Sequence, residues 1–154
     1  GKVKKAWILI GMFAFALGHI FYIAGILAGF YVPGNAIFII LPFTLPIVFI
    51  CVYMLIARKV GIYFGKGMLP FGIFYLYCLS SVVFSSLCMA ILHQFSMSTL
   101  IMFFVGAVFF ASSDMMLTGA YFKEGKRSGA YMATYSVFYY IAQFVIAFSI
   151  FFIL

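Results

Sequence analysis

Five long apolar segments dominate the sequence and restrict what the chain can fold into. They run approximately over residues 6–30, 36–57, 68–91, 98–121 and 132–154. About 20 helical residues cross the roughly 30 Å of hydrocarbon in a bilayer. Because the connecting segments are short, the helices are expected to run antiparallel to one another. The sequence therefore predicts an all-α, multi-pass transmembrane helical bundle with five spans.

The composition supports a membrane location for the whole chain. Charged residues make up only 7% of the sequence and hydrophobic residues 68%, whereas a soluble domain has about a quarter of its residues charged. No soluble domain, linker or repeat interrupts the pattern, so residues 1–154 are expected to form a single transmembrane domain. The first apolar segment lacks a cleavage pattern and is too long for a signal peptide. The chain begins with Gly1 instead of methionine, which suggests a fragment of a longer protein.

The basic residues predict the orientation. All nine flank the apolar segments on one side, as Lys2, Lys4, Lys5, Arg58, Lys59, Lys66, Lys123, Lys126 and Arg127. Cytoplasmic loops are enriched in Lys and Arg, so these loops are expected to be cytoplasmic. The membrane would be the endoplasmic reticulum in a eukaryote, or the plasma or inner membrane in a bacterium. The net charge of +7 is thus explained by topology and contact with anionic lipids, without nucleic-acid binding.

Two kinds of helix-modifying residue predict local packing. Gly11, Gly18, Gly25 and Gly29 form a stripe on the first segment, which predicts close contact with a neighbouring helix. The second segment contains two prolines, at positions 42 and 46. They remove backbone donors and predict a bend.

A single carboxyl group lies within the apolar segments. Asp114 is the only aspartate in the chain, and the other acid, Glu124, falls in a basic loop. A charged group costs at least about 2.5 kcal/mol in mid-membrane, so Asp114 needs a structural or functional reason to be there. It shares a helical stripe with the small residues Ala107, Ala111 and Thr118. This stripe predicts a recess that faces the interior of the bundle, although a carboxyl that joins two helices by hydrogen bonding is the alternative.

Three other segments carry polar stripes that could converge with Asp114. The sets are His19 with Tyr22; Tyr77, Ser81, Ser85 and Cys88; and Tyr135, Tyr139 and Gln143. Taken singly, such residues often bond to helix carbonyls or join helices. Taken together, they predict a wet cavity beneath the cytoplasmic surface.

Several common chemistries are disfavoured. The chain has two histidines and no HExxH motif, so no metal site is expected and a three-histidine zinc site is excluded within it. The three cysteines, at positions 51, 78 and 88, lie in apolar runs and are interpreted as packing residues. A Ser–His–Asp set built from Ser81 or Ser85 with His19 and Asp114 is conceivable, but no motif supports it.

Three sequence stretches resemble a known membrane family. "FVGAVFFASSDMMLTGAYF", a basic loop and "TYSVFYYIAQFVIAFS" resemble the last two helices of the YhhN family, the lysoplasmalogenases. "MFAFALGHIFYIAG" is similar to a middle helix of that family. The family has about eight helices, so the resemblance implies that this chain is the C-terminal five-helix part. A Gly-Asp motif that supplies a second aspartate would lie upstream.

The resemblance also implies a reaction. Family members hydrolyse the vinyl-ether bond of lysoplasmalogens and release a fatty aldehyde and glycerophosphoethanolamine or glycerophosphocholine, without a cofactor. Vinyl-ether cleavage starts with proton transfer to carbon, and burial favours the proton-bearing form of a carboxyl group. The resemblance therefore implies that Asp114 is a catalytic residue, as one member of a carboxylate pair whose other member is the upstream aspartate that this chain lacks. The residues expected to bind or orient the substrate are His19, Tyr22, Ser113, Tyr139, Tyr140 and Gln143.

Two other classes of function stay open at this point. The chain could be a transporter or channel segment in which Asp114 binds a proton or cation. It could also be a non-catalytic scaffold that binds lipids. The lysophospholipid substrate and the surrounding membrane lipids are the expected partners, and the sequence does not indicate an oligomeric state.

Overall fold

The computed structural model describes residues 2–63, 67–122 and 128–152, and within these ranges the chain is helical without any strand. The helices are α1 (Lys2–Phe30), α2 (Ile37–Lys59), α3 (Leu69–Leu92), α4 (Ser98–Phe122) and α5 (Gly129–Ser149), followed by the 3₁₀ helix η1 (Ile150–Phe152). The five α-helices are all long and apolar enough to cross a membrane. This confirms the predicted fold class and its five spans.

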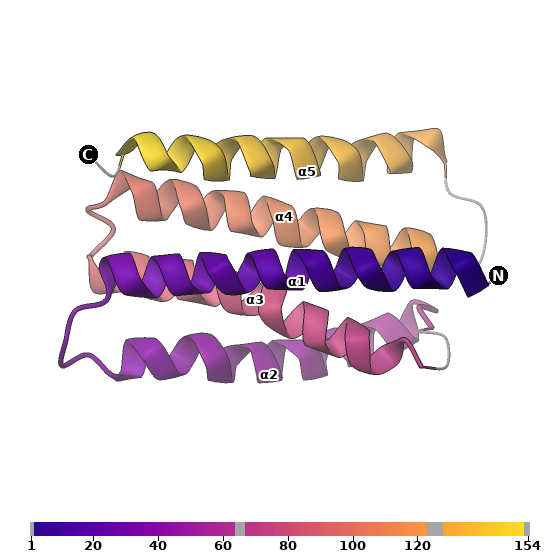
Figure 1. The fold of residues 1–154 in the computed structure, drawn as a ribbon, viewed down its shortest axis with the longest axis horizontal. Helices are drawn as coiled ribbons and strands as arrows, with labels where there is room; N and C mark the ends of the chain where they lie inside the picture. Colours follow the sequence, from indigo (N-terminus) through magenta and orange to yellow (C-terminus); the bar gives the residue numbers. More distant parts are fainter. Residues whose placement is uncertain (1, 64–66, 123–127, 153–154) are drawn as a thin grey trace.

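The helices run alternately in opposite directions (Figure 1). The start of α1, the end of α2, the start of α3, the end of α4 and the start of α5 lie together, and we call this the N-terminal end of the bundle. Arg58 and Lys59 at the end of α2 belong to it. Four of the other basic residues and Glu124 fall outside the described residues, as do the side chains of Lys2, Lys4 and Lys5. The cytoplasmic location of this end stays a prediction.

Helix α3 is the centre of the bundle. It packs against α1, α2 and α4, while α5 packs along α4. In its most apolar stretch 61% of the residues are buried, against 11–33% in the corresponding stretches of the other four helices. Small residues make this close packing possible. Ser81 and Ser85 of α3, for example, are fully buried between helices.

The glycine stripe on α1 does not form the predicted helix contact within the described structure. A Cβ atom added at Gly11, Gly18, Gly25 or Gly29 would meet nothing within 4 Å. The close backbone approach occurs instead between α4 and α5, where a Cβ on Gly106 would lie 3.2 Å from the carbonyl oxygen of Ala142. The sequence pattern revealed small residues but not which helix they would face.

The two prolines of α2 are buried within a continuous helix. Tyr77 of α3 donates a hydrogen bond of 3.0 Å to the carbonyl oxygen of Phe43, which lies between them. Tyr77 therefore links α2 to α3.

Candidate active site

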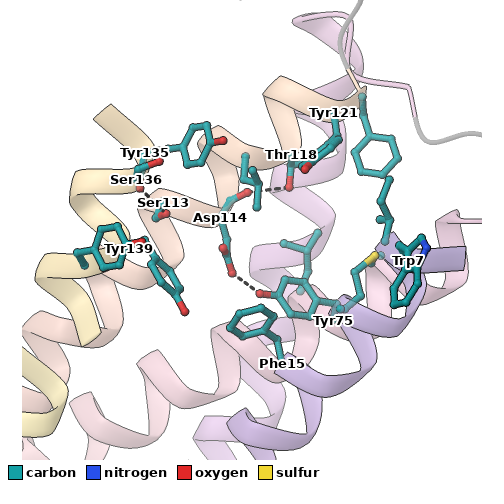
Figure 2. Close-up of a pocket in the computed structure, with 18 residues that line it drawn as sticks. Trp7, Phe15, Tyr75, Ser113, Asp114, Thr118, Tyr121, Tyr135, Ser136 and Tyr139 are labelled. Atoms are coloured by element: carbon teal, nitrogen blue, oxygen red, sulfur yellow. Dashed lines mark hydrogen bonds between the residues drawn. The ribbon is translucent and has the colours of Figure 1, made fainter. Parts of the chain in front are cut away.

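A cavity of about 420 Å³ opens in the N-terminal end of the bundle (Figure 2). Helices α1, α3, α4 and α5 all contribute to its walls. Three of its lining residues, Trp7, Tyr121 and Tyr140, are 60–70% exposed. The cavity is thus accessible from outside the bundle.

Asp114 lies in the wall of this cavity and is only 7% exposed. The hydroxyl of Tyr75 on α3 donates a hydrogen bond to its Oδ2 atom, and the hydroxyl of Thr118 donates to its main-chain oxygen at 2.8 Å (Figure 2). Asp114 lies eight positions before Phe122 at the end of α4. At 1.5 Å per residue, the carboxyl group therefore lies about 12 Å below that end.

The walls of the cavity differ sharply in polarity. The wall from α1 is apolar throughout and consists of Trp7, Ile8, Gly11, Met12 and Phe15. The other walls include the apolar residues Leu76, Leu117 and Phe122, but they also carry the carboxyl of Asp114 and all of the hydroxyl-bearing residues of the lining, which are Tyr75, Ser113, Thr118, Tyr121, Tyr135, Ser136, Tyr139 and Tyr140. A ligand that matches both sides must itself be amphipathic.

Three aromatic rings pack together at one wall of the cavity. Phe15 of α1, Phe110 of α4 and Tyr139 of α5 contact one another, with ring centroids 5.5–6.3 Å apart. Phe15 and Tyr139 line the cavity, whereas Phe110 lines a separate void of about 10 Å³ on the other side. We call these three rings the aromatic layer. It lies between the cavity around Asp114 and this small void.

The YhhN family model matches residues 3–150. The chain belongs to the YhhN family. Comparison with curated proteins and with solved structures gives no match. Since the family match runs from α1 to the start of η1, every wall of the cavity in this YhhN protein is built from matched residues.

The YhhN cavity includes four of the residues predicted from sequence. Ser113, Asp114, Tyr139 and Tyr140 all line it. Ser113 is buried, and its hydroxyl donates to the carbonyl oxygen of Tyr135 at 2.8 Å. This bond joins α4 to α5 next to Asp114.

Three other predicted site residues do not reach the cavity. His19 and Tyr22 line the small void behind the aromatic layer, and Gln143 lines neither space. His19 is held by a 2.5 Å hydrogen bond from its Nδ1 to the carbonyl oxygen of Phe15. Its ring lies edge-on to Tyr75, with centroids 5.8 Å apart. The structure thus places His19 against a cavity-lining residue and outside the cavity wall.

The polar stripe on α3 does not line the cavity, so the prediction that it would is wrong. Tyr77 bonds to α2, and Ser81, Ser85 and Cys88 are buried away from the cavity. The hydroxyls of Ser81 and Ser85 have no hydrogen-bond partner among the described residues. Consequently, neither serine forms a nucleophile–base pair with His19, and the Ser–His–Asp set is not assembled.

Sequence reasoning missed Tyr75, the residue of α3 that does contact Asp114. Tyr75 and Tyr77 are two positions apart, so they point to nearly opposite faces of the helix. Both lie in the same apolar run, and the pattern does not say which face is turned toward α4. Within the described residues, no group of three or more His, Cys, Asp or Glu side chains could hold a metal ion.

Proposed function

We propose that this YhhN family protein is an integral-membrane hydrolase of the lysoplasmalogenase type. It would cleave the vinyl-ether bond of a lysoplasmalogen to a fatty aldehyde and glycerophosphoethanolamine or glycerophosphocholine. The observation that carries the proposal is a buried carboxyl group, Asp114, in the polar wall of an amphipathic cavity that opens at the end of the bundle.

The chemistry needs one proton donor that can later accept a proton. Asp114 transfers its proton to the alkenyl carbon that does not bear the ether oxygen, and an oxocarbenium ion forms at its neighbour. Water adds to that cation while the Asp114 carboxylate accepts a proton from the water, as a glycosidase acid does in its second step. The resulting hemiacetal then separates into an aldehyde and an alcohol. In sum, one vinyl ether and one water give one aldehyde and one alcohol, and Asp114 regains its proton.

The shape and polarity of the cavity support a single-chain phospholipid as the substrate. A volume of about 420 Å³ lies within the usual range of small-molecule sites, roughly 300–1,000 Å³. The apolar α1 wall, from Trp7 to Phe15, suits a hydrocarbon chain. The hydroxyl-rich wall opposite suits the glycerol backbone and its ether oxygen.

The aromatic layer favours a hydrolase over a channel or transporter. A transport path must continue across the membrane, yet the rings of Phe15, Phe110 and Tyr139 pack against one another at the wall of the cavity. The void that Phe110 lines holds only about 10 Å³. A cavity bounded by packed rings suits a substrate that enters and leaves by the same opening.

The proposal is tested by measuring aldehyde release from lysoplasmenyl-ethanolamine by the protein expressed from its complete gene. Replacing Asp114 with Asn keeps the shape and removes the acid, so we expect activity to fall by about 10²- to 10⁴-fold. Thr134→Ala is the matched control, because Thr134 is an exposed residue of α5 that bonds to its own helix. Full activity in Asp114→Asn would refute the proposal.

A further inference from the structure

We propose that Tyr75 is the positioning residue for Asp114. It fixes the carboxyl group through Oδ2 and leaves Oδ1 as the oxygen that exchanges the proton with the substrate. This inference rests on the proposed function for its kinetic consequence. The contact itself can be tested without turnover.

The first support is how the carboxyl group is held. Among the described residues, the Tyr75 hydroxyl is the one side-chain group that hydrogen-bonds the Asp114 carboxyl, and it does so at Oδ2. Asp114 belongs to α4 and Tyr75 to the central helix α3. A short aspartate side chain has few rotamers, so one bond from a neighbouring helix is enough to set the direction of the other oxygen.

The second support is that Tyr75 is itself held from behind. Its ring meets the His19 ring edge-on, at an interplanar angle of 83°. His19 is in turn fixed by its hydrogen bond to the Phe15 carbonyl oxygen, one turn earlier in α1. A chain of contacts from α1 through α3 to α4 thus orients the carboxyl group. It gives His19 an indirect role, through its contact with Tyr75.

The hydrogen bond should act mainly during the reaction and less during binding. When Asp114 gives up its proton, negative charge develops on the carboxylate in a site shielded from water. A hydrogen bond to an ionised acceptor is roughly twice as strong as one between neutral groups. Tyr75 therefore stabilises the transition state more than the bound substrate, and its loss should lower kcat and leave KM nearly unchanged.

Tyr75→Phe removes only the hydroxyl group. We expect kcat to fall by about 10- to 100-fold, the usual effect of losing one hydrogen bond to a charged group, with KM within about twofold of the wild-type value. Tyr77→Phe is the matched control. It removes a hydroxyl from the same helix whose bond goes to Phe43 of α2, away from the cavity.

If Tyr75 positions Asp114, both variants should lower the melting temperature by similar amounts, because each loses one interhelical hydrogen bond, but only Tyr75→Phe should lower kcat. A purely structural role for Tyr75 predicts instead that the two variants have the same kcat. Equal kcat values in the two variants would overturn the inference. An unchanged kcat/KM in Tyr75→Phe, together with an inactive Asp114→Asn variant, would also overturn the inference. The proposed function would stand in that case.

Infrared difference spectroscopy tests the contact independently of activity. The carboxyl vibration of Asp114 is assigned by its loss in Asp114→Asn, and it should shift in Tyr75→Phe but not in Tyr77→Phe. If the band shifts while Asp114→Asn keeps full activity, the contact is real but the proposed function fails. An unshifted band in Tyr75→Phe would refute the contact.

Discussion

The contact between α4 and α5 at Gly106 gives the sharpest prediction about the fold. A Cβ atom at this position would lie 2.6 Å from Cγ1 of Ile146 and 3.2 Å from both the carbonyl oxygen of Ala142 and the backbone nitrogen of Ile146. Two of these three neighbours are backbone atoms of α5, and they cannot move without the helix. Gly106→Ala should therefore push α5 away from α4.

The expected cost follows from that geometry. Overpacking of this kind destabilises a protein by about 1–3 kcal/mol, which for a chain of this size lowers the melting temperature by about 2–12 °C. Gly18→Ala is the matched control, since its Cβ would meet nothing within 4 Å. At that position alanine should be neutral or slightly stabilising, because it is a better helix former than glycine.

Thermal unfolding of the purified protein in detergent measures both variants, and a double-mutant cycle adds a check. Ile146→Ala removes Cγ1, the nearest atom, but leaves the two backbone contacts. In that background Gly106→Ala should cost less than in the wild type, although still more than Gly18→Ala. If Gly106→Ala unfolds at the same temperature as Gly18→Ala, the reasoning about this helix contact is refuted.

Three further predictions concern the cavity and the opposite end of the bundle. Gly11→Leu adds a side chain to the apolar cavity wall and should raise KM for the lysolipid by about tenfold, the equivalent of roughly 1–2 kcal/mol of lost contact with the lipid chain. Gly18→Leu is the control, because Gly18 does not line the cavity, and it should not raise KM. A lysolipid with a saturated ether in place of the vinyl ether has no carbon for Asp114 to protonate; it should inhibit competitively without releasing product, and cleavage of this analogue would contradict the acid mechanism. His93→Ala removes a 2.8 Å hydrogen bond to the carbonyl oxygen of Phe30, so the free energy of unfolding should fall by about 1 kcal/mol while kcat stays the same. A reduced kcat would contradict this prediction and show that this end of the bundle is coupled to the cavity.

Much of the site was predictable because the membrane makes polar residues informative. Asp114 is singled out by the cost of a carboxyl group in hydrocarbon. Of the stripe predicted to form a recess, Asp114 and Thr118 line the cavity, whereas Ala107 lines the separate small void and Ala111 lines neither space. Helical spacing and the family resemblance predicted Ser113, Tyr139 and Tyr140, which line the same cavity. Residues on other helices were harder to place, because spacing along one helix does not fix its rotation toward the next.

Tyr75 and the glycines illustrate this limit. The stripe through Tyr77 looked like the polar face of α3, yet the helix turns Tyr75 toward Asp114 and Tyr77 toward α2. Likewise, four glycines of α1 have open space around them, whereas the single Gly106 makes the close approach. A polar or small residue reveals that a contact is possible, but its partner depends on how two helices are rotated and offset.

By itself, the sequence determined the helical class, the number of spans, the family and the one intramembrane acid. These follow from the cost of placing backbone and charged groups in hydrocarbon, which acts on each segment separately. Only the tertiary structure decided which side chains surround that acid, that α1 supplies an apolar wall, and that the aromatic layer packs at the wall of the cavity. Those features arise where four helices meet, and their rotations are set jointly by side-chain packing, which no single segment encodes.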